Sequence, residues 1–182
     1  MPRWFKQKQK PVSVKFPTLK DLQQYVPQTG RLDWIGKRPE KKSPLVPCLS
    51  ATITLDEGIV GDHYSRKGGK RQVTLIQAEH LHTIGAILNR EPIDPGLARR
   101  NLVVSGINLL SLIKQQVQIG AEVILEITGN CHPCSRMEEN LGDGGYAAMR
   151  GHGGVTARVV HGGTIQQGDP VRIFEPKTQA HA

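Results

Sequence analysis

The feature that most constrains the fold is a series of short strand-like runs separated by glycine and proline turns. The longest run covers residues 117–128 and contains Gly120, which indicates a bend or bulge within one strand. Shorter β-branched runs cover residues 71–76, 101–104, 155–160 and 171–174. Strands that outnumber helices at such short spacing are typical of barrels and closed sandwiches. The 182-residue chain is therefore predicted to be mainly β and to form a barrel or closed sandwich.

A few short helices are predicted to pack outside these strands. Thr18 is expected to cap a helix that ends near Tyr25, and apolar spacing predicts a second helix over residues 77–88. The pattern over residues 134–141 is helical, and residues 146–150 are expected to form a helical turn. Further strands are expected at residues 11–16 and 31–35, and a turn is expected at Gly162-Gly163.

Composition restricts the class of protein. Aromatic residues make up only 4% of the chain, so the core is expected to be mostly aliphatic. No apolar run approaches the roughly 18 residues that span a bilayer, and the N-terminus lacks a secretory pattern, so neither a membrane protein nor a secreted one is expected. Three cysteines is an odd number, which favours free thiols over a disulfide framework. We therefore expect a reducing compartment, the cytoplasm.

The positive charge is concentrated in the N-terminal quarter. Residues 1–44 contain eleven Lys or Arg and three Asp or Glu, whereas residues 45–182 contain thirteen of each. This basic N-terminal extension is interpreted as a solvated segment, and the alternative is a docking surface for an acidic partner or a polyanion. No zinc finger, helix-turn-helix or aromatic-basic RNA signature accompanies it, so a nucleic-acid partner is not indicated.

The strongest chemical motif is Cys131-x-x-Cys134, which directly precedes the helical pattern over residues 134–141. The thiolate is the reactive form of cysteine, and a position at the start of a helix favours it, as do the nearby His132 and Arg136. Four interpretations remain open. They are a zinc knuckle, a thioredoxin-type redox pair, a single thiolate that ligates a soft metal or carries sulfur, and a buried inert pair.

Two further motifs carry polar chemistry. Arg99-Arg100-Asn101 begins a strand, where two guanidiniums and an amide form either a phosphate or carboxylate clamp or a solvated turn. The segments Gly61-Asp62-His63 and 142–154 are glycine-rich, which allows close backbone approach to a ligand or simply a tight turn. Neither segment matches a Walker A or Rossmann pattern, so a nucleotide site is not supported.

Together these motifs resemble the MOSC domain, the C-terminal domain of molybdenum cofactor sulfurases and of their stand-alone bacterial relatives. The resemblance covers about residues 45–174. It depends on the order of several short motifs, which are Gly58 to His63, Arg71 to Ile76, Arg99 to Gly106, Ile119-Gly120-Ala121, Pro133-Cys134, Gly154-x-x-Ala157-Arg158-Val159, and Gly162-Gly163-x-Ile165-x-x-Gly168-Asp169. The family fold is a strand-rich β-barrel, in agreement with the strand pattern. The resemblance therefore implies a basic extension over 1–44, a barrel domain over 45–174 and a polar tail over 175–182.

The resemblance also implies a function and a site. Family members bind the molybdenum cofactor or carry sulfur on one cysteine, and Cys134 matches that cysteine. An Arg-x-Asn at the equivalent strand start helps to hold the cofactor, which corresponds to Arg99 and Asn101. Residues in the other motifs are expected to assist: Arg71, Gly61, Asp62 and Arg158. Pyridoxal phosphate is not expected, because it belongs to a cysteine-desulfurase domain that this chain lacks.

Three functions follow from the resemblance and the motifs. The first is a molybdenum-cofactor enzyme, with Cys134 as metal ligand, that reduces N-hydroxylated compounds using an external electron donor. The second is a sulfur carrier that holds a persulfide on Cys134 and receives sulfur from a donor protein. The third is a binding protein without chemistry that docks through residues 1–44.

Overall fold

The computed structural model describes residues 18–64 and 66–175. The expected strand over residues 11–16 lies outside them. The described helices are α1 (Leu19–Gln24), α2 (Ala78–Ile87), α3 (Pro95–Ala98), η1 (Leu109–Leu112), α4 (Ser135–Leu141) and α5 (Gly145–Met149). The described strands are β1 (Gly30–Lys37), β2 (Val46–Cys48), β3 (Ser50–Thr54), β4 (Gly58–Ile59), β5 (Val73–Gln77), β6 (Leu102–Ser105), β7 (Gln116–Ile119), β8 (Val123–Asn130), β9 (Val155–His161), β10 (Gly163–Gln166) and β11 (Pro170–Ile173).

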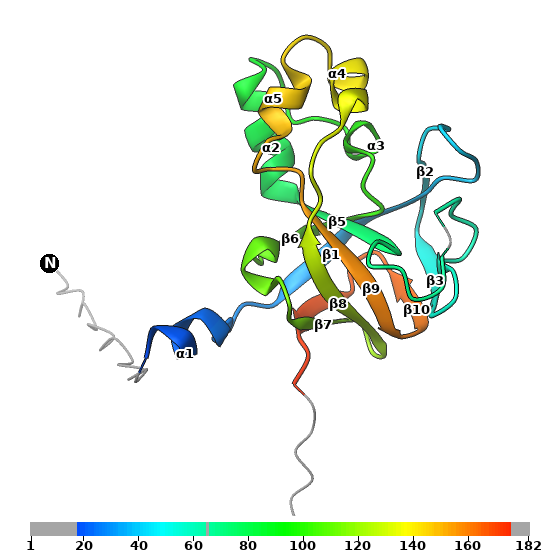
Figure 1. Ribbon diagram of the computed structural model, residues 1–182, viewed down its shortest axis with the longest axis vertical. Coiled ribbons are helices and arrows are strands. Elements are labelled where there is room, and N and C mark those ends of the chain that lie inside the picture. The colour runs from blue at the N-terminus through cyan, green and yellow to red at the C-terminus, as the bar shows by residue number, and fades with distance from the viewer. Residues whose placement is uncertain (1–17, 65, 176–182) are drawn as a thin grey trace, which may run out of the picture.

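Seven strands close into a barrel, which confirms the predicted mainly β fold with a few short helices outside it (Figure 1). Their order is β11-β7-β8-β9-β5-β6-β1, and pairing of Gly30 with Val171 joins β1 to β11. The end of β1 also pairs with β2. The strands β10, β3 and β4 form a second, smaller sheet. The predicted start of the barrel domain at Leu45 thus falls between β1 and β2, two hydrogen-bonded neighbours.

Two predictions, one of a strand and one of a turn, were wrong in detail. The run over residues 117–128 forms two antiparallel strands, β7 and β8, because Gly120 adopts a φ of 63° and turns the chain. Gly163 was expected in a turn, but it is the first residue of β10. That strand exists because Gly163 and its neighbours pair with β3, which is more than 100 residues earlier, so no local pattern could indicate it.

The predicted helices are confirmed with small shifts in their ends. Thr18 caps α1, and its side-chain oxygen accepts a hydrogen bond from the backbone N–H of Asp21. Helices α2 to α5 gather at one end of the barrel (Figure 1). None of the helices in the described residues has the length and apolar character of a membrane span.

Two aliphatic clusters stabilise this arrangement. The larger one fills the barrel and includes Leu75, Leu102 and Leu125, which are fully buried. The smaller one lies under the helices, where Ile76 and Val103 from β5 and β6 pack with residues of α2, α4 and α5. Because both faces of β5 are buried, this strand connects the barrel interior to the helical end.

The pairing of β5 with β6 is parallel, unlike the other strand pairs in the described part of the chain. A parallel pair requires a crossover, and here α2 and α3 supply it. The crossover returns the chain to the sheet at Arg99 and Arg100, immediately before β6. The motif Arg99-Arg100-Asn101 is therefore placed beside β5, at the boundary between the barrel and the helices.

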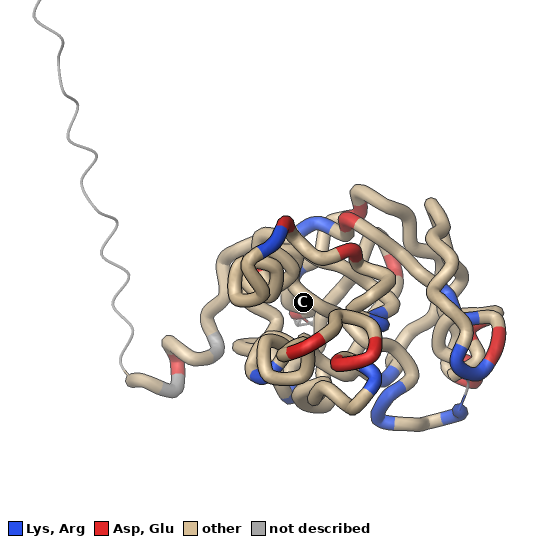
Figure 2. Tube along the Cα trace, turned by 90° about the horizontal axis from the view of Figure 1, so that it is seen from above, with Lys and Arg blue, Asp and Glu red and all other residues tan. Residues whose placement is uncertain are grey.

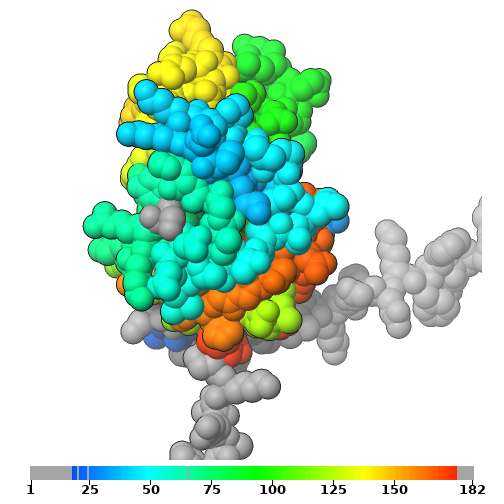
Figure 3. Space-filling view, turned by 90° about the vertical axis from the view of Figure 1, so that its right-hand side faces the viewer, coloured from blue at the N-terminus to red at the C-terminus, as the bar shows by residue number. Residues whose placement is uncertain are grey.

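The loop after β1 lies over the same boundary. In Figure 3 the residues that follow β1, in blue, lie between the helical end above and the loops of the second sheet below. This arrangement brings three sequence-distant segments together, which are the β1–β2 loop, the residues before β5 and the residues between β8 and α4.

Candidate anion and thiol site

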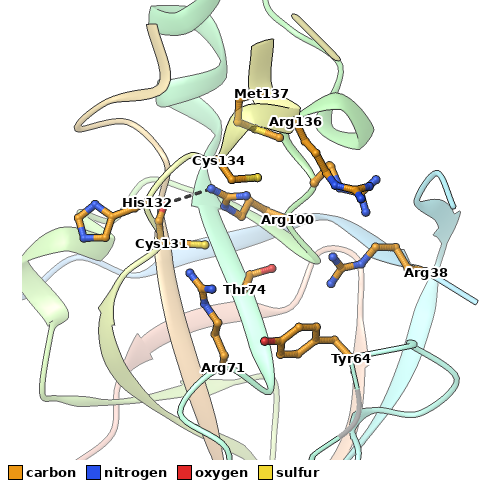
Figure 4. A pocket seen from close by; sticks show the side chains of 11 residues that line it. Arg38, Tyr64, Arg71, Thr74, Arg100, Cys131, His132, Cys134, Arg136 and Met137 are labelled. Carbon is orange, nitrogen blue, oxygen red and sulfur yellow. Dashed lines mark hydrogen bonds between the residues drawn. The ribbon is translucent and has the colours of Figure 1, made fainter. Parts of the chain in front are cut away.

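A cavity of about 210 Å³ lies where these segments meet (Figure 4). Its wall comes from five parts of the chain, which are the loop after β1, the loop between β4 and β5, the start of β5, the end of α3 and the segment from β8 to α4. The lining residues are Arg38, Tyr64, Arg71, Thr74, Arg99, Arg100, Cys131, His132, Cys134, Arg136 and Met137. Five of them are arginines and two are cysteines, so the wall combines strong positive charge with thiols.

This positive charge is poorly compensated. No Asp or Glu is among the lining residues. The guanidinium of Arg38 reaches the buried carboxylate of Asp62 at 3.5 Å, and none of the other four arginines forms an ion pair within residues 18–64 and 66–175. Figure 2 shows that acids and bases are otherwise mixed around the described molecule. The excess of positive charge is thus a property of the cavity rather than of the whole surface.

Arg100 is the most deeply buried of these arginines, with 5% of its surface exposed. Its guanidinium donates hydrogen bonds to three backbone carbonyls, those of Gly153 (2.6 Å), Ala98 (2.9 Å) and Cys131 (3.1 Å). Carbonyl dipoles solvate the charge but do not neutralise it. Burial lowers the pKa of Arg100. Arg100 therefore presents a buried positive charge to the cavity, and no described carboxylate pairs with it.

Arg38 and Arg99 complete the cationic wall with distinct features. The Nε of Arg38 is buried and has no hydrogen-bond partner among the described residues. Arg99 adopts a left-handed backbone conformation, with a φ of 54°, and donates to the carbonyl of Ser43 at 3.2 Å. Burial, followed by the neighbouring guanidiniums of Arg38 and Arg136, lowers the pKa of Arg99. A buried N–H without an acceptor and crowded guanidiniums both favour an anion in the cavity.

A buried polar network holds this wall in place from behind. The amide nitrogen of Asn101 donates to the carbonyl of Gly36 (3.2 Å) and to Asp62 (2.8 Å), and its oxygen accepts from the backbone N–H and hydroxyl of Thr74. Asp62 also accepts from the backbone N–H of Arg38 at 2.8 Å. The network thus ties β1, β5 and β6 together and fixes the loop that carries Arg38.

The two cysteines of the motif differ in exposure. Cys134 is exposed and is the N-cap residue of α4, whereas Cys131 is 5% exposed. The backbone N–H of Cys131 donates to the carbonyl of Gly154 at 2.8 Å, which extends the β8–β9 pairing by one residue. Both side chains line the cavity. The third cysteine, Cys48 on β2, does not line it.

Glycines let the backbone close around this segment. A Cβ at Gly153 would lie 2.3 Å from the carbonyl oxygen of Cys131, and one at Gly154 would lie 2.0 Å from that of Leu75. Gly154 also has a φ of 79°. In this part of the glycine-rich segment, close backbone packing therefore explains the glycines, and it positions the carbonyls that hold Arg100.

The structure brings together only some of the residues expected from sequence. Cys134, Arg71 and Arg99 line the cavity. Asn101 and Asp62 lie behind the wall, buried, with their side chains engaged in the network above. The lining does not include Gly61 or Arg158. Gly61 is exposed with a φ of 80°, and Arg158 forms an ion pair with Glu126 at 2.5 Å.

Sequence reasoning did not select Arg38, Tyr64 or Thr74, which also line the cavity. Arg38 lies within the basic residues 1–44, where no local pattern distinguishes it from its lysine neighbours. The available signal was its position three residues after the end of the strand predicted over residues 31–35.

The structure also limits the metal chemistry. No group of three or more His, Cys, Asp or Glu side chains within the described residues is arranged to hold a metal ion. A zinc knuckle made from protein ligands is therefore not formed there. A metal that enters with its own additional ligands needs only one thiolate from the protein, and Cys134 is the exposed candidate.

The comparisons with known proteins agree with this architecture. The model of the MOSC domain matches residues 62–172. Among solved structures, the YUAD protein from Bacillus subtilis is similar with a TM-score of 0.72 at 17% identity, over 82% of this chain and 98% of the other. YiiM from Geobacillus stearothermophilus has a TM-score of 0.62 at 18% identity, over 85% and 78% of the two chains. YiiM from Escherichia coli has a TM-score of 0.59 at 14% identity, over 80% and 70%.

The search of curated proteins found no match. The solved structures are too distant in sequence to carry more than the fold. The family model covers more than half of the chain, and the chain belongs to the MOSC domain family. The resemblance inferred from the short motifs is thus confirmed.

Proposed function

We propose that the cavity binds the molybdenum cofactor through its phosphate-bearing pterin, with Cys134 as the protein ligand to the metal. The reaction that the family resemblance favours is reduction of N-hydroxylated compounds, with electrons from an external donor in the cytoplasm. The single observation that carries the proposal is the buried Nε of Arg38, which has no hydrogen-bond partner in the described part of the chain, in a wall where Arg100 has no counterion from that part either. Both are accounted for by a bound anion.

The residues of the cavity fit the two ends of such a ligand. The guanidiniums of Arg38, Arg71 and Arg99 offer several N–H donors to phosphate oxygens, and arginine suits the bidentate geometry that phosphate presents. The thiolate of Cys134 is a soft ligand of the kind that molybdenum accepts. When bound, the cofactor would supply two-electron redox chemistry that no side chain can perform alone.

The chain's own residues would have binding and positioning roles. Arg100, held by three carbonyls, maintains positive charge at the base of the cavity. Asn101 and Asp62 would act as positioning residues, because their hydrogen bonds fix the backbone of Arg38 and of β5. Arg71 is exposed at the mouth of the cavity, where it favours entry of an anion.

The test is the molybdenum and pterin content of protein purified from a host that makes the cofactor. We expect both in the wild-type protein. Arg38→Met should lower both, whereas Cys134→Ser should lower molybdenum more than pterin. Arg31→Met, which changes an exposed arginine outside the cavity, is the matched control and should leave both unchanged. Absence of molybdenum and pterin from the wild-type protein, even after reconstitution, would refute the proposal.

A second function is favoured by a specific observation, the exposure of Cys134 beside the buried charge of Arg100. An exposed cysteine near a guanidinium is suited to carry a sulfur atom as a persulfide, with sulfur from a donor protein. Mass spectrometry of the native protein tests this function. A sulfur adduct that disappears on reduction and is absent from Cys134→Ser is the expected result, and no adduct even with a sulfur donor present would exclude it.

A further inference from the structure

The carrier function gives no role to the thiol of Cys131. It lines the same cavity as Cys134, and in Figure 4 the side chains of both cysteines lie on the cavity side of their segment. Cys131 is nearly closed to bulk solvent, whereas Cys134 is exposed. A reagent from solution therefore meets Cys134 first, and Cys131 can react with what Cys134 then carries.

The backbone between the two cysteines permits a change in their separation. Cys131 is anchored by the carbonyl of Gly154, and the carbonyl of Cys134 accepts from the N–H of Met137. Between these anchors, His132 and Pro133 make no backbone hydrogen bond with the rest of the described chain. Disulfide formation requires Cα atoms about 4.4–6.8 Å apart, and no backbone hydrogen bond among the described residues holds this two-residue linker against such an adjustment.

One buried cation, the guanidinium of Arg100, lies near both cysteines. Burial lowers the pKa of Arg100, whereas Cys131 and Cys134 each raise it, so its guanidinium lies within electrostatic reach of both sulfur atoms. The same guanidinium donates to the backbone carbonyl of Cys131 at 3.1 Å. One buried cation thus stabilises a negative charge on either sulfur, which lowers the cost of moving that charge from one to the other.

We propose that Cys131 is the resolving thiol of this site, which discharges sulfur carried on Cys134 as hydrosulfide and leaves a disulfide between Cys131 and Cys134. This inference rests on the sulfur-carrying function and adds a second catalytic residue to it. The role is assigned to Cys131 and not to Cys48, because Cys48 lies on β2 and does not line the cavity. Burial, the largest effect, also raises the pKa of the Cys48 thiol, which disfavours its thiolate.

The step balances without an additional oxidant. The Cys131 thiolate attacks the inner sulfur of the Cys134 persulfide, and a new sulfur–sulfur bond forms between the two cysteines. The bond from the inner to the outer sulfur breaks, and the outer sulfur leaves with its electron pair as hydrosulfide. The carried sulfur is reduced and the two thiols are oxidised to a disulfide. An external dithiol or thiol reductant restores the starting state.

The experiment uses the full chain, fully reduced, with inorganic polysulfide as the sulfur donor and sampling by intact mass and peptide mapping. In the wild type we expect a transient sulfur adduct and then a Cys131–Cys134 disulfide, with one hydrosulfide released for each adduct lost once the unreacted polysulfide has been removed. Cys131→Ser should keep a stable persulfide on Cys134. Cys48→Ser, the matched control, should behave as the wild type. Cys131→Ala repeats the test with a smaller apolar side chain, and urea denaturation confirms that each variant is folded.

The outcomes separate this inference from the function on which it rests. A wild-type protein that keeps its persulfide, or forms a disulfide with Cys48, would overturn the role of Cys131 and leave the carrier function intact. Absence of any sulfur adduct from Cys131→Ser and Cys131→Ala would overturn both. Faster loss of the adduct in the wild type than in the two Cys131 variants, with the hydrosulfide recovered, would establish the role.

Discussion

The substitution Asn101→Asp tests the buried network with the change of a single atom group, from an amide NH2 to an oxygen. Asn101 is 2% exposed. Its oxygen faces the backbone N–H of Thr74, which can only donate, so the amide nitrogen must face Gly36 and Asp62. In the variant, an oxygen replaces that nitrogen at 2.8 Å from the Asp62 carboxylate. Two hydrogen bonds become contacts between acceptors.

The cost follows from these distances. Two full charges that lie 2.8 Å apart repel each other by roughly 6 kcal/mol at an effective dielectric constant of about 20. Binding one proton between them relieves this repulsion. Binding this proton costs about 1.4 kcal/mol for each pH unit above the ordinary aspartate pKa of about 3.9, which is about 4 kcal/mol at about pH 7. The Gly36 carbonyl still loses its donor, at about 1 kcal/mol. The expected loss of stability is therefore about 5 kcal/mol at about pH 7.

The loss should depend on pH with a definite sign. At neutral pH the folded variant binds a proton that the unfolded chain does not, so acid favours the folded form. The difference from wild type should shrink by about 3 kcal/mol between about pH 7 and about pH 5. Urea denaturation of both proteins at the two pH values measures this difference in the free energy of unfolding. Asn89→Asp, at an exposed position, is the matched control. A loss below about 1 kcal/mol at about pH 7, or one that is independent of pH, would refute the reasoning.

Two further predictions concern backbone packing and acid sensitivity. Gly154→Ala should lose at least about 2 kcal/mol in urea denaturation, because its Cβ would meet the carbonyl of Leu75. Gly151→Ala, with a similar φ but open space, should lose only about 1 kcal/mol, and equal losses would contradict the steric argument. Burial, followed by His152, lowers the pKa of His80. Its contribution to stability is thus present above about pH 6.5 and lost on acidification, and His80→Gln should flatten the decline in urea midpoint below that pH. An unchanged slope would argue against it.

Local sequence signals predicted the elements that depend on nearest neighbours. Thr18 indicated the start of α1 because a side-chain oxygen three residues before a free backbone N–H satisfies it. The β-branched runs likewise indicated most barrel strands, because the preference for a strand depends on the residues of the run itself. Gly120 was recognised as a break, but the sequence could not distinguish a bulge from a reversal. That choice depends on pairing between residues on both sides of the glycine.

Long-range pairing decided the rest. The strand β10 exists through its hydrogen bonds to β3, and closure of the barrel depends on β1 meeting β11. A segment of the chain cannot show in its own composition which distant edge will accept its N–H groups. For the same reason, the sequence could not show that β1 contributes to the barrel despite lying within the basic N-terminal quarter.

For the candidate site, the sequence by itself indicated a candidate thiol and positive charge that the structure places in one cavity. Cys134 and Arg99 could be selected from their motifs, because thiol and guanidinium chemistry are properties of single side chains. Only the tertiary structure decided which guanidiniums share a cavity. It also decided that the side chain of Asn101 joins the hydrogen-bond network behind this cavity and that Cys131 lines the cavity. Burial and hydrogen-bond partners are set by segments far apart in the chain, so they exist only once the barrel has closed.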